Sequence, residues 1–281
     1  MTTQPNTLPT QEPLPFADLH LSDGDLRAVQ KFIYDAAGIT LDNSKRTLIG
    51  GRLNKRLRYH GLHKFGDYLN LIAINPHERQ IALDLLTTNE TYFFREPQHF
   101  DFLRSQILPN RNRNQPFRVW SAACSSGEEV YSIAMLLDEE LCQSRWEVIG
   151  TDISTRVLEA CQRGRYVMER AQHIPEHYLK SYCLKGMGPE EGFLLVDKRI
   201  RKNVKFLHAN LNGQLPNLGQ FDVIFLRNVM IYFDPETKRK LIARLLNHLP
   251  SGGWLFVGHS ETLNGINSHV RQVRPAIYQK P

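Results

Sequence analysis

Residues 117–135 read FRVWSAACSSGEEVYSIAM, and this stretch decides the expected fold. Phe117–Ala122 is an apolar run with the length of a buried strand, and an apolar periodicity typical of a helix begins at Glu128. The residues between them are small and include a single glycine, Gly127, so the backbone can approach a ligand closely. A strand, a small-residue loop and a helix in this order are typical of the first ligand-binding turn of a doubly wound α/β sheet.

The same alternation continues to the end of the chain. Further strands are predicted at 147–151, 204–207, 221–226 and 254–257, and crossover helices at 128–141, 155–163 and 235–249. Asp234 is the expected N-cap of the last helix, with Pro235 at its first position. The expected fold class is α/β, a parallel Rossmann-like sheet. The pattern alone leaves an unrelated two-domain α/β protein as an alternative.

The chain before this alternation has a different character. Residues 1–17 are rich in Pro, Thr, Gln and Asn and are predicted to be a disordered tail. Residues 18–88 are predicted to form a small helical domain, with helices from Ser22 to Gly38 and at 43–59, 65–74 and 76–86. Residues 89–281 then form the sheet domain. Within it, the turn-rich stretch 165–203 contains a β-prone run, 193–196, and is predicted to be an inserted β-subdomain.

Charge is unevenly distributed along the 281 residues. The net charge is +6, and seven Lys or Arg residues but no Asp or Glu lie between Asn43 and Gly66. This surface is suited to an acidic partner, with a solvated helix face, the commoner fate of charge runs, as the alternative. The candidate partner-binding residues are Lys45, Arg46, Arg52, Lys55, Arg56 and Arg58.

Other sequence features restrict the possible functions. No run of eighteen apolar residues and no export signal is present, so the protein is expected in the cytoplasm. The four cysteines form no CxxC pair and the eleven histidines form no HExxH cluster. These spacings favour neither a disulfide framework nor a catalytic metal.

Polar side chains follow successive predicted strands, at the edge of the sheet where ligands bind. Asp152 follows the second strand and can accept hydrogen bonds from ribose hydroxyls, or it caps the next helix. Asn210 and Leu211 can bracket an adenine, or the asparagine forms an ordinary turn. Arg227 and Asn228 end the fourth strand and are expected to face the crevice.

The first loop indicates which ligand this edge accepts. GxGxxG is absent, and Glu128 and Glu129 at the helix start would repel a pyrophosphate, so a cationic or neutral ligand is favoured. Ser125 and Glu128 also match a capping box, which gives Glu128 a structural alternative. Before the sheet, Arg95 lies at the junction of the two domains, where it either pairs with a ligand carboxylate or remains a solvated charge.

Four segments taken together resemble the CheR family of chemotaxis receptor methyltransferases. They are TNETYFFRE (88–96), RVWSAACSSGEEVYSIAM (118–135), GTDIS (150–154) and FLRNVMIYFDPE (225–236). The resemblance implies S-adenosylmethionine as cofactor, with S-adenosylhomocysteine as product and no metal. It implies that Asn89, Thr91 and Arg95 contact the methionine part of the cofactor. Glu128 and Asp152 would hold its amino and ribose groups. Four residues would surround its adenine: Asn210, Leu211, Asn228 and Val229. It leaves open whether Glu128 or Glu129 makes the contact.

The resemblance also implies an acceptor. Family members methylate glutamate carboxylates of chemotaxis receptors, and this anionic nucleophile needs no general base. Arg95 and Tyr232 are candidates for steering the glutamate. The basic helical domain would meet the receptor's methylation region, and the β-subdomain would grip a receptor tail, so that the enzyme is recruited to receptor arrays at the membrane.

Two other functions remain as alternatives. One is a nucleic-acid methyltransferase, although Asn228 is followed by Val-Met-Ile where amino-methylating enzymes have Pro-Pro and an aromatic residue. The other is a non-catalytic module that binds S-adenosylmethionine or its product.

Overall fold

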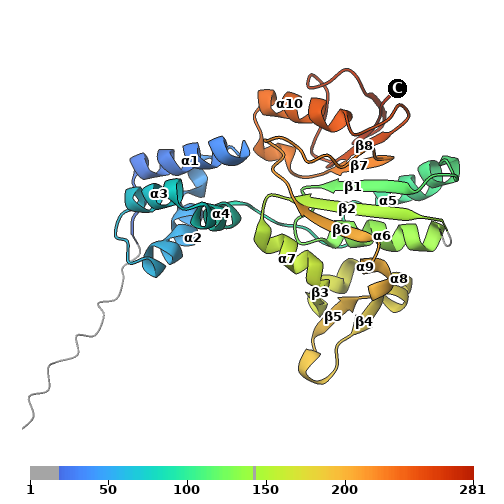
Figure 1. Ribbon diagram of the computed structural model, residues 1–281, viewed down its shortest axis with the longest axis horizontal. Helices are drawn as coiled ribbons and strands as arrows, with labels where there is room; N and C mark the ends of the chain where they lie inside the picture. The colour runs from blue at the N-terminus through green and yellow to red at the C-terminus, as the bar shows by residue number, and fades with distance from the viewer. Residues whose placement is uncertain (1–18, 142–143) are drawn as a thin grey trace, which may run out of the picture.

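The computed structural model describes residues 19–141 and 144–281, and the predicted tail at 1–17 lies outside the described residues. An all-helical domain lies beside a larger sheet domain (Figure 1). Within the described ranges, no helix has the length and apolar character needed to cross a membrane.

The helical domain contains four helices at the predicted positions. They are α1 (Asp23–Ala37), α2 (Arg46–Tyr59), α3 (Phe65–Ile74) and α4 (Pro76–Leu86), with a 3-10 turn, η1 (Asn43–Lys45), before α2. Ser22 Oγ accepts from the Asp25 backbone N–H while the Asp25 carboxylate accepts from the Ser22 N–H, which is a reciprocal capping box. Gly38 ends α1 with a φ of 72°. The apolar faces of the helices form one core cluster of their own.

The sheet domain contains a seven-stranded sheet in the order β6-β2-β1-β7-β8-β10-β9. Its strands are β1 (Phe117–Ala122), β2 (Trp146–Asp152), β6 (Val204–His208), β7 (Val223–Leu226), β8 (Trp254–Val257), β9 (Arg271–Arg274) and β10 (Ile277–Gln279). The five strands from β6 to β8 are parallel, as predicted. The antiparallel pair β10 and β9 was missed and makes the sheet mixed. All four residues of β9 are exposed, so this edge strand has no apolar run that would reveal it.

Three crossover helices cover both faces of the sheet. They are α6 (Glu128–Leu141), α7 (Thr155–Arg163) and α10 (Pro235–Leu246). Along β1, Val119 belongs to the core cluster that includes α6, and the next residue, Trp120, belongs to the cluster that includes α10. Both faces of the strand are therefore buried, which explains its largely apolar sequence. Two predicted elements are longer than the observed ones. The strand predicted at 221–226 begins at Val223, and the helix predicted at 235–249 ends at Leu246.

The stretch 165–203 carries a small antiparallel sheet in the order β3-β5-β4 (Figure 1). Its strands are β3 (Arg165–Val167), β4 (Cys183–Lys185) and β5 (Phe193–Val196), with short helical segments η4 (Met168–His173), α8 (Glu176–Tyr182), η5 (Gly188–Glu190) and α9 (Lys198–Arg201). The central strand, β5, is the run predicted at 193–196.

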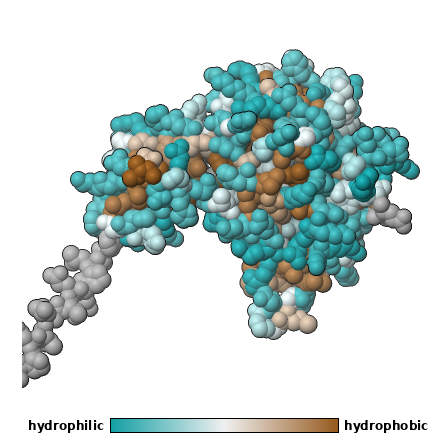
Figure 2. Space-filling model, in the orientation of Figure 1, coloured by the Kyte–Doolittle hydropathy of each residue, from teal (hydrophilic) through white to brown (hydrophobic). Residues whose placement is uncertain are grey.

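Two further segments complete the site region. The helical segment α5 (Pro97–Phe102) follows the junction and continues through a π-helical turn, η2 (Leu103–Ile107), and a 3-10 turn, η3 (Leu108–Asn110). The 3-10 turn η6 (Met230–Tyr232) follows β7. In the orientation of Figure 2, apolar surface gathers near the place where the helical domain meets the sheet domain, within a largely hydrophilic surface.

Specific hydrogen bonds hold the helical domain against the strand ends. Asn210 Nδ2 donates to the Ala36 carbonyl at 2.6 Å, and the Thr40 N–H donates to the Tyr232 carbonyl at 2.8 Å. The Asp84 carboxylate, on α4, accepts from the Thr155 N–H at 3.1 Å and thereby caps α7 of the other domain. In each of these contacts, a backbone N–H or C=O group of one domain finds its hydrogen-bond partner in the other domain.

Candidate functional site

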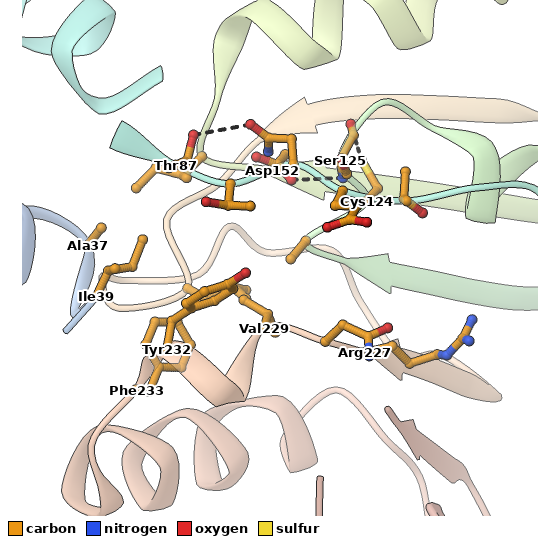
Figure 3. Close-up of a pocket in the computed structure, with 18 of the residues that line it drawn as sticks. Ala37, Ile39, Thr87, Cys124, Ser125, Asp152, Arg227, Val229, Tyr232 and Phe233 are labelled. Atoms are coloured by element: carbon orange, nitrogen blue, oxygen red, sulfur yellow. Dashed lines mark hydrogen bonds between the residues drawn. The ribbon is translucent and has the colours of Figure 1, made fainter. Parts of the chain in front are cut away.

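A cavity opens at the carboxyl ends of the parallel strands, and the helical domain supplies one wall (Figure 3). The space between its atoms, counted out to its open mouth, is about 970 Å³. Nine of the ten cofactor-contacting or acceptor-steering residues that the family resemblance implied line it: Asn89, Thr91, Arg95, Asp152, Asn210, Leu211, Asn228, Val229 and Tyr232. The doubly wound topology therefore brings the strand-end residues together as expected.

Asp152 is buried at the end of β2, with 5% of its surface exposed. Its Oδ2 accepts from the Ser125 N–H at 2.9 Å (Figure 3). Its Oδ1 accepts from the Ser154 N–H at 2.9 Å. Burial raises the pKa of Asp152, although these backbone donors oppose the change. Each carboxylate oxygen can accept more than one hydrogen bond, so Asp152 both fixes the loops and retains acceptor capacity for a ligand hydroxyl.

The two neighbouring glutamates at the start of α6 have different surroundings. Glu128 is fully buried, accepts from Ser126 Oγ at 2.6 Å and pairs with Arg170 of the inserted stretch. Glu129 lines the cavity instead. Successive helix residues point about 100° apart, and here the two carboxylates take different partners. Of the two glutamates between which the family resemblance left the contact open, Glu129 lines the cavity and Glu128 does not.

The proposed capping box between Ser125 and Glu128 is not formed. Within the described part of the chain, Ser125 Oγ is buried without a hydrogen-bond partner, and Ser125 lines the cavity. A buried hydroxyl without a partner is costly unless a ligand or water satisfies it. Ser125 is therefore a candidate ligand contact, and the capping box that its spacing to Glu128 suggested as an alternative is absent.

The cavity wall contains strained backbone. Ala123, Ser125 and Asn228 line it with φ values of 69°, 51° and 57°, in the left-handed region that non-glycine residues seldom adopt. Such strain costs on the order of 1–3 kcal/mol per residue and persists only where surrounding contacts impose it. At Asn228 that contact is Glu261, whose Oε2 accepts from the Asn228 N–H at 2.8 Å while Oε1 accepts from the Met230 N–H at 2.7 Å.

Glu261 was missed from the sequence because it follows a strand by a short turn and carries no motif of its own. It is buried, and burial raises the pKa of Glu261 although its backbone donors oppose the change. Its carboxylate also accepts from the Gly258 N–H at 2.7 Å. Glu261 therefore acts as a brace that holds the loop after β7 in the shape of the site.

Arg227 is buried between two carboxylates. Its Nη1 lies 2.7 Å from Glu129 Oε2, and its Nη2 lies 3.1 Å from Glu96 Oε2. Glu129 Oε1 in turn accepts from Ser121 Oγ at 2.7 Å. These contacts fix the Glu129 carboxylate at the cavity wall and balance the charge of Arg227.

The helical domain contributes a wall that no sequence pattern had indicated. Ala37, Ile39, Leu41, Leu86 and Thr87 line the cavity, and Ile39 forms an isolated antiparallel bridge with Phe233. These residues are far from the strand loops in the sequence. Only the packing of the two domains brings them to the site.

At the junction, Arg95 and Tyr232 are both half-buried. Arg95 Nη1 donates to the Glu90 carbonyl at 3.1 Å, and its guanidinium carbon lies 5.7 Å from the centre of the Tyr92 ring. Burial raises the pKa of Tyr232, and the nearby Glu90 adds to the rise. Both side chains line the cavity.

The predicted basic surface is partly used inside the helical domain. Arg52 Nη1 donates to the Leu85 and Thr87 carbonyls at 2.9 and 3.1 Å, and Arg56 Nη2 lies 2.5 Å from Glu78 Oε2. Arg46 donates to the Leu21 carbonyl at 2.7 Å and pairs with Asp23. The remaining members, Lys45, Lys55 and Arg58, are exposed. The acids that pair with this run lie outside it in the sequence.

The donor set of the cavity fits S-adenosylmethionine better than a dinucleotide. The described lining contains three carboxylates, Glu90 at the domain junction, Glu129 in the first turn of α6 and Asp152 at the end of β2. It also contains apolar faces from Leu211 and Val229, and no lysine. Arg227 is neutralised by its glutamates, which leaves Arg95 as the guanidinium available to a ligand carboxylate. Anionic walls suit a cationic sulfonium nucleoside and repel a pyrophosphate.

The sequence is similar to known methyltransferases, which agrees with a cavity suited to S-adenosylmethionine. Residues 24–87 match the family model described as CheR methyltransferase, all-alpha domain, and residues 89–278 match CheR methyltransferase, SAM binding domain. A chemotaxis protein methyltransferase of Escherichia coli is 43% identical over 251 residues, covering 88% of this chain and 87% of that protein. Chemotaxis protein methyltransferase 2 of Pseudomonas aeruginosa is 37% identical over 277 residues, covering 96% and 99%. The chain therefore belongs to the CheR methyltransferase family and is an S-adenosylmethionine-dependent methyltransferase of chemotaxis.

Proposed function

We propose that the methyl acceptor is a glutamate side-chain carboxylate of a chemotaxis receptor, so that the product is a glutamate methyl ester. The family match over residues 24–278 carries this proposal, and the curated relatives are named chemotaxis protein methyltransferases. The cavity is compatible with it, because its described lining contains no histidine, the side chain that most often acts as a general base. A carboxylate is already anionic and needs no such base.

The cofactor supplies an electrophilic methyl group on a sulfonium. We assign Asp152 to the ribose hydroxyls, and Asn210, Leu211, Asn228 and Val229 to the adenine. Asn89, Thr91 and Arg95 would contact the methionine part, with Arg95 on its carboxylate. Glu129 takes the place of Glu128 as partner of the amino group, because its carboxylate is held at the cavity by Arg227.

The chain's contribution to the transfer is alignment and exclusion of water. Positioning two reactants in line can contribute roughly 7–11 kcal/mol to the lowering of a barrier. Arg95 and Tyr232, at the junction, would steer the incoming carboxylate toward the methyl group. No metal takes part in this step.

The two other parts of the molecule would recognise the receptor. The exposed Lys45, Lys55 and Arg58 suit the acidic methylation segments of a receptor's cytoplasmic helices, and the inserted β-sheet would bind a receptor tail. The protein would then act in the cytoplasm and be recruited to receptor arrays at the membrane.

The test is the transfer of labelled methyl groups from S-adenosylmethionine to receptor-containing membranes. We expect the label to be released as methanol in mild base, because methyl esters hydrolyse there whereas N-methyl groups do not. Membranes without receptors and total RNA are the controls. Base-stable label, label on RNA, or cofactor binding without transfer would each contradict the proposal.

A further inference from the structure

Three side chains with metal-ligating atoms meet outside the cavity. They are Glu96 and His99, at the start of α5, and His259, in the loop after β8. One ligand atom from each lies within 4.8 Å of the others. His99 Nδ1 lies 3.5 Å from Glu96 Oε2, and His259 Nε2 lies 3.8 Å from the same oxygen.

The cluster contains polar atoms that the rest of the described chain leaves unsatisfied. His99 is 1% exposed, and neither of its ring nitrogens has a hydrogen-bond partner among the described residues. A neutral imidazole carries one N–H donor and one acceptor nitrogen, and burying both unpaired costs free energy. Glu96 Oε2 likewise receives no well-aligned hydrogen bond within the described chain, although Arg227 Nη2 lies 3.1 Å away.

We propose that Glu96, His99 and His259 form a binding site for a divalent transition-metal ion of the zinc type. Two imidazoles and a carboxylate are ligands that zinc accepts, with a water in the fourth position. Ligand bonds of about 2.0–2.1 Å put tetrahedral ligand atoms about 3.3 Å apart, so the two distances of 3.5 and 3.8 Å require little change. His259 is 47% exposed and can make the remaining adjustment from the solvent side.

The surrounding charges permit such an ion. Arg227 is the neighbouring cation, and its charge is already opposed by Glu96 and Glu129. A carboxylate has about four lone-pair sites, so Glu96 can ligate an ion and keep its contact with Arg227. The group of two glutamates, Arg227 and two neutral histidines carries a net charge of −1, which a divalent ion changes to +1.

Such an ion would join two segments on which the cavity depends. Glu96 directly follows the cavity residue Arg95, and the loop of His259 also carries Glu261, the brace of Asn228. The three ligands themselves do not line the cavity. The ion would therefore stabilise the walls of the site without touching the reacting groups.

The test uses the full chain, first treated with a chelator to remove bound metal and then freed of the chelator. Titration with Zn²⁺ in a calorimeter should show one equivalent bound, and Co²⁺ should give visible ligand-field absorption of a tetrahedral site with nitrogen and oxygen ligands. His259→Ala should weaken Zn²⁺ binding at least tenfold. His269→Ala removes another exposed histidine outside the cluster and should bind like the wild type.

Thermal unfolding provides a second measurement, because an ion that binds the folded state raises Tm. We expect Zn²⁺ to raise the Tm of the wild type and of His269→Ala but not that of His259→Ala. Glu96→Gln keeps the shape of a ligand while removing its charge, and it should also weaken Zn²⁺ binding at least tenfold. Equal Zn²⁺ affinity in the wild type, His259→Ala and Glu96→Gln would overturn the proposal, as would an absence of stoichiometric binding in the wild type.

Discussion

Arg227 Nη1 and Glu129 Oε2 lie 2.7 Å apart, which joins the end of β7 to the first turn of α6 at the wall of the cofactor cavity. The Arg227 side chain is 2% exposed and that of Glu129 is 12% exposed. A buried pair of this kind is costly to break on one side only, because the remaining charge loses its partner. The pair therefore sets the position of the Glu129 carboxylate, while Glu128 is held by Arg170.

Glu129→Gln should weaken S-adenosylmethionine binding roughly ten- to a hundredfold in calorimetry, since a charge-assisted hydrogen bond contributes about 1.5–3 kcal/mol. Glu128→Gln is the matched control, and its cofactor affinity should equal that of the wild type. A larger loss of affinity in Glu128→Gln than in Glu129→Gln would return the contact to Glu128.

Asp152→Asn should lower cofactor affinity at least about tenfold while preserving the circular dichroism spectrum. The asparagine carbonyl can still accept one of the two backbone hydrogen bonds that Asp152 makes with Ser125 and Ser154. Asp152→Ala removes both bonds, so we expect it to abolish cofactor binding and also to lower Tm. Unchanged cofactor affinity in Asp152→Asn would remove this carboxylate from the ligand contacts.

Lys45→Glu combined with Lys55→Glu should lower kcat/KM for receptor methylation roughly three- to tenfold at low salt, and less at high salt, because the exposed charges are screened. Cofactor affinity should not change, because neither residue lines the cavity. Arg113→Glu combined with Lys202→Glu makes the same change in net charge at other exposed positions. An equal loss of activity in both double variants would mean that only net charge matters.

Glu78 makes the stability of the helical domain depend on pH. Burial alone would raise the pKa of Glu78, but hydrogen bonds from Arg56, Tyr68 and His60 outweigh it and lower the pKa to about 2. A lowered carboxyl pKa stabilises the folded state above the unfolded value of about 4.5, and this contribution is lost as the pH falls toward 2. We expect roughly 2–3 kcal/mol to be lost over this window, measured by urea unfolding at a series of pH values.

Glu78→Gln is the control for this pH dependence. It should lower stability at neutral pH by roughly 3–5 kcal/mol, because Arg56 is left without its buried partner, and it should flatten the stability curve between pH 4.5 and 2. A curve in Glu78→Gln as steep as that of the wild type would assign the pH dependence to other carboxyl groups.

Local sequence determined the elements and the edge of the sheet that carries the site. Helices such as α3 (65–74) and strands such as β1 (117–122) have the predicted bounds, because their apolar periodicity and caps act within a few residues. The topology rule for doubly wound sheets then placed Asp152, Asn210 and Asn228 at one cavity. Element bounds follow from short-range patterns, and the place of the strand-end residues follows because parallel strands end at a common edge of the sheet.

Contacts between distant segments were decided by the tertiary structure alone. Glu129 lines the cavity and Glu128 does not, because Arg227 and Arg170 hold the two carboxylates in different places. Arg56, part of an uninterrupted basic run, is paired because α4 brings Glu78 to it. The sequence spacing of the histidines favoured no metal, yet folding places His259 beside His99 and Glu96. Burial and pairing depend on which surfaces the packed elements exclude from water, and a residue's own neighbours in the sequence do not specify that.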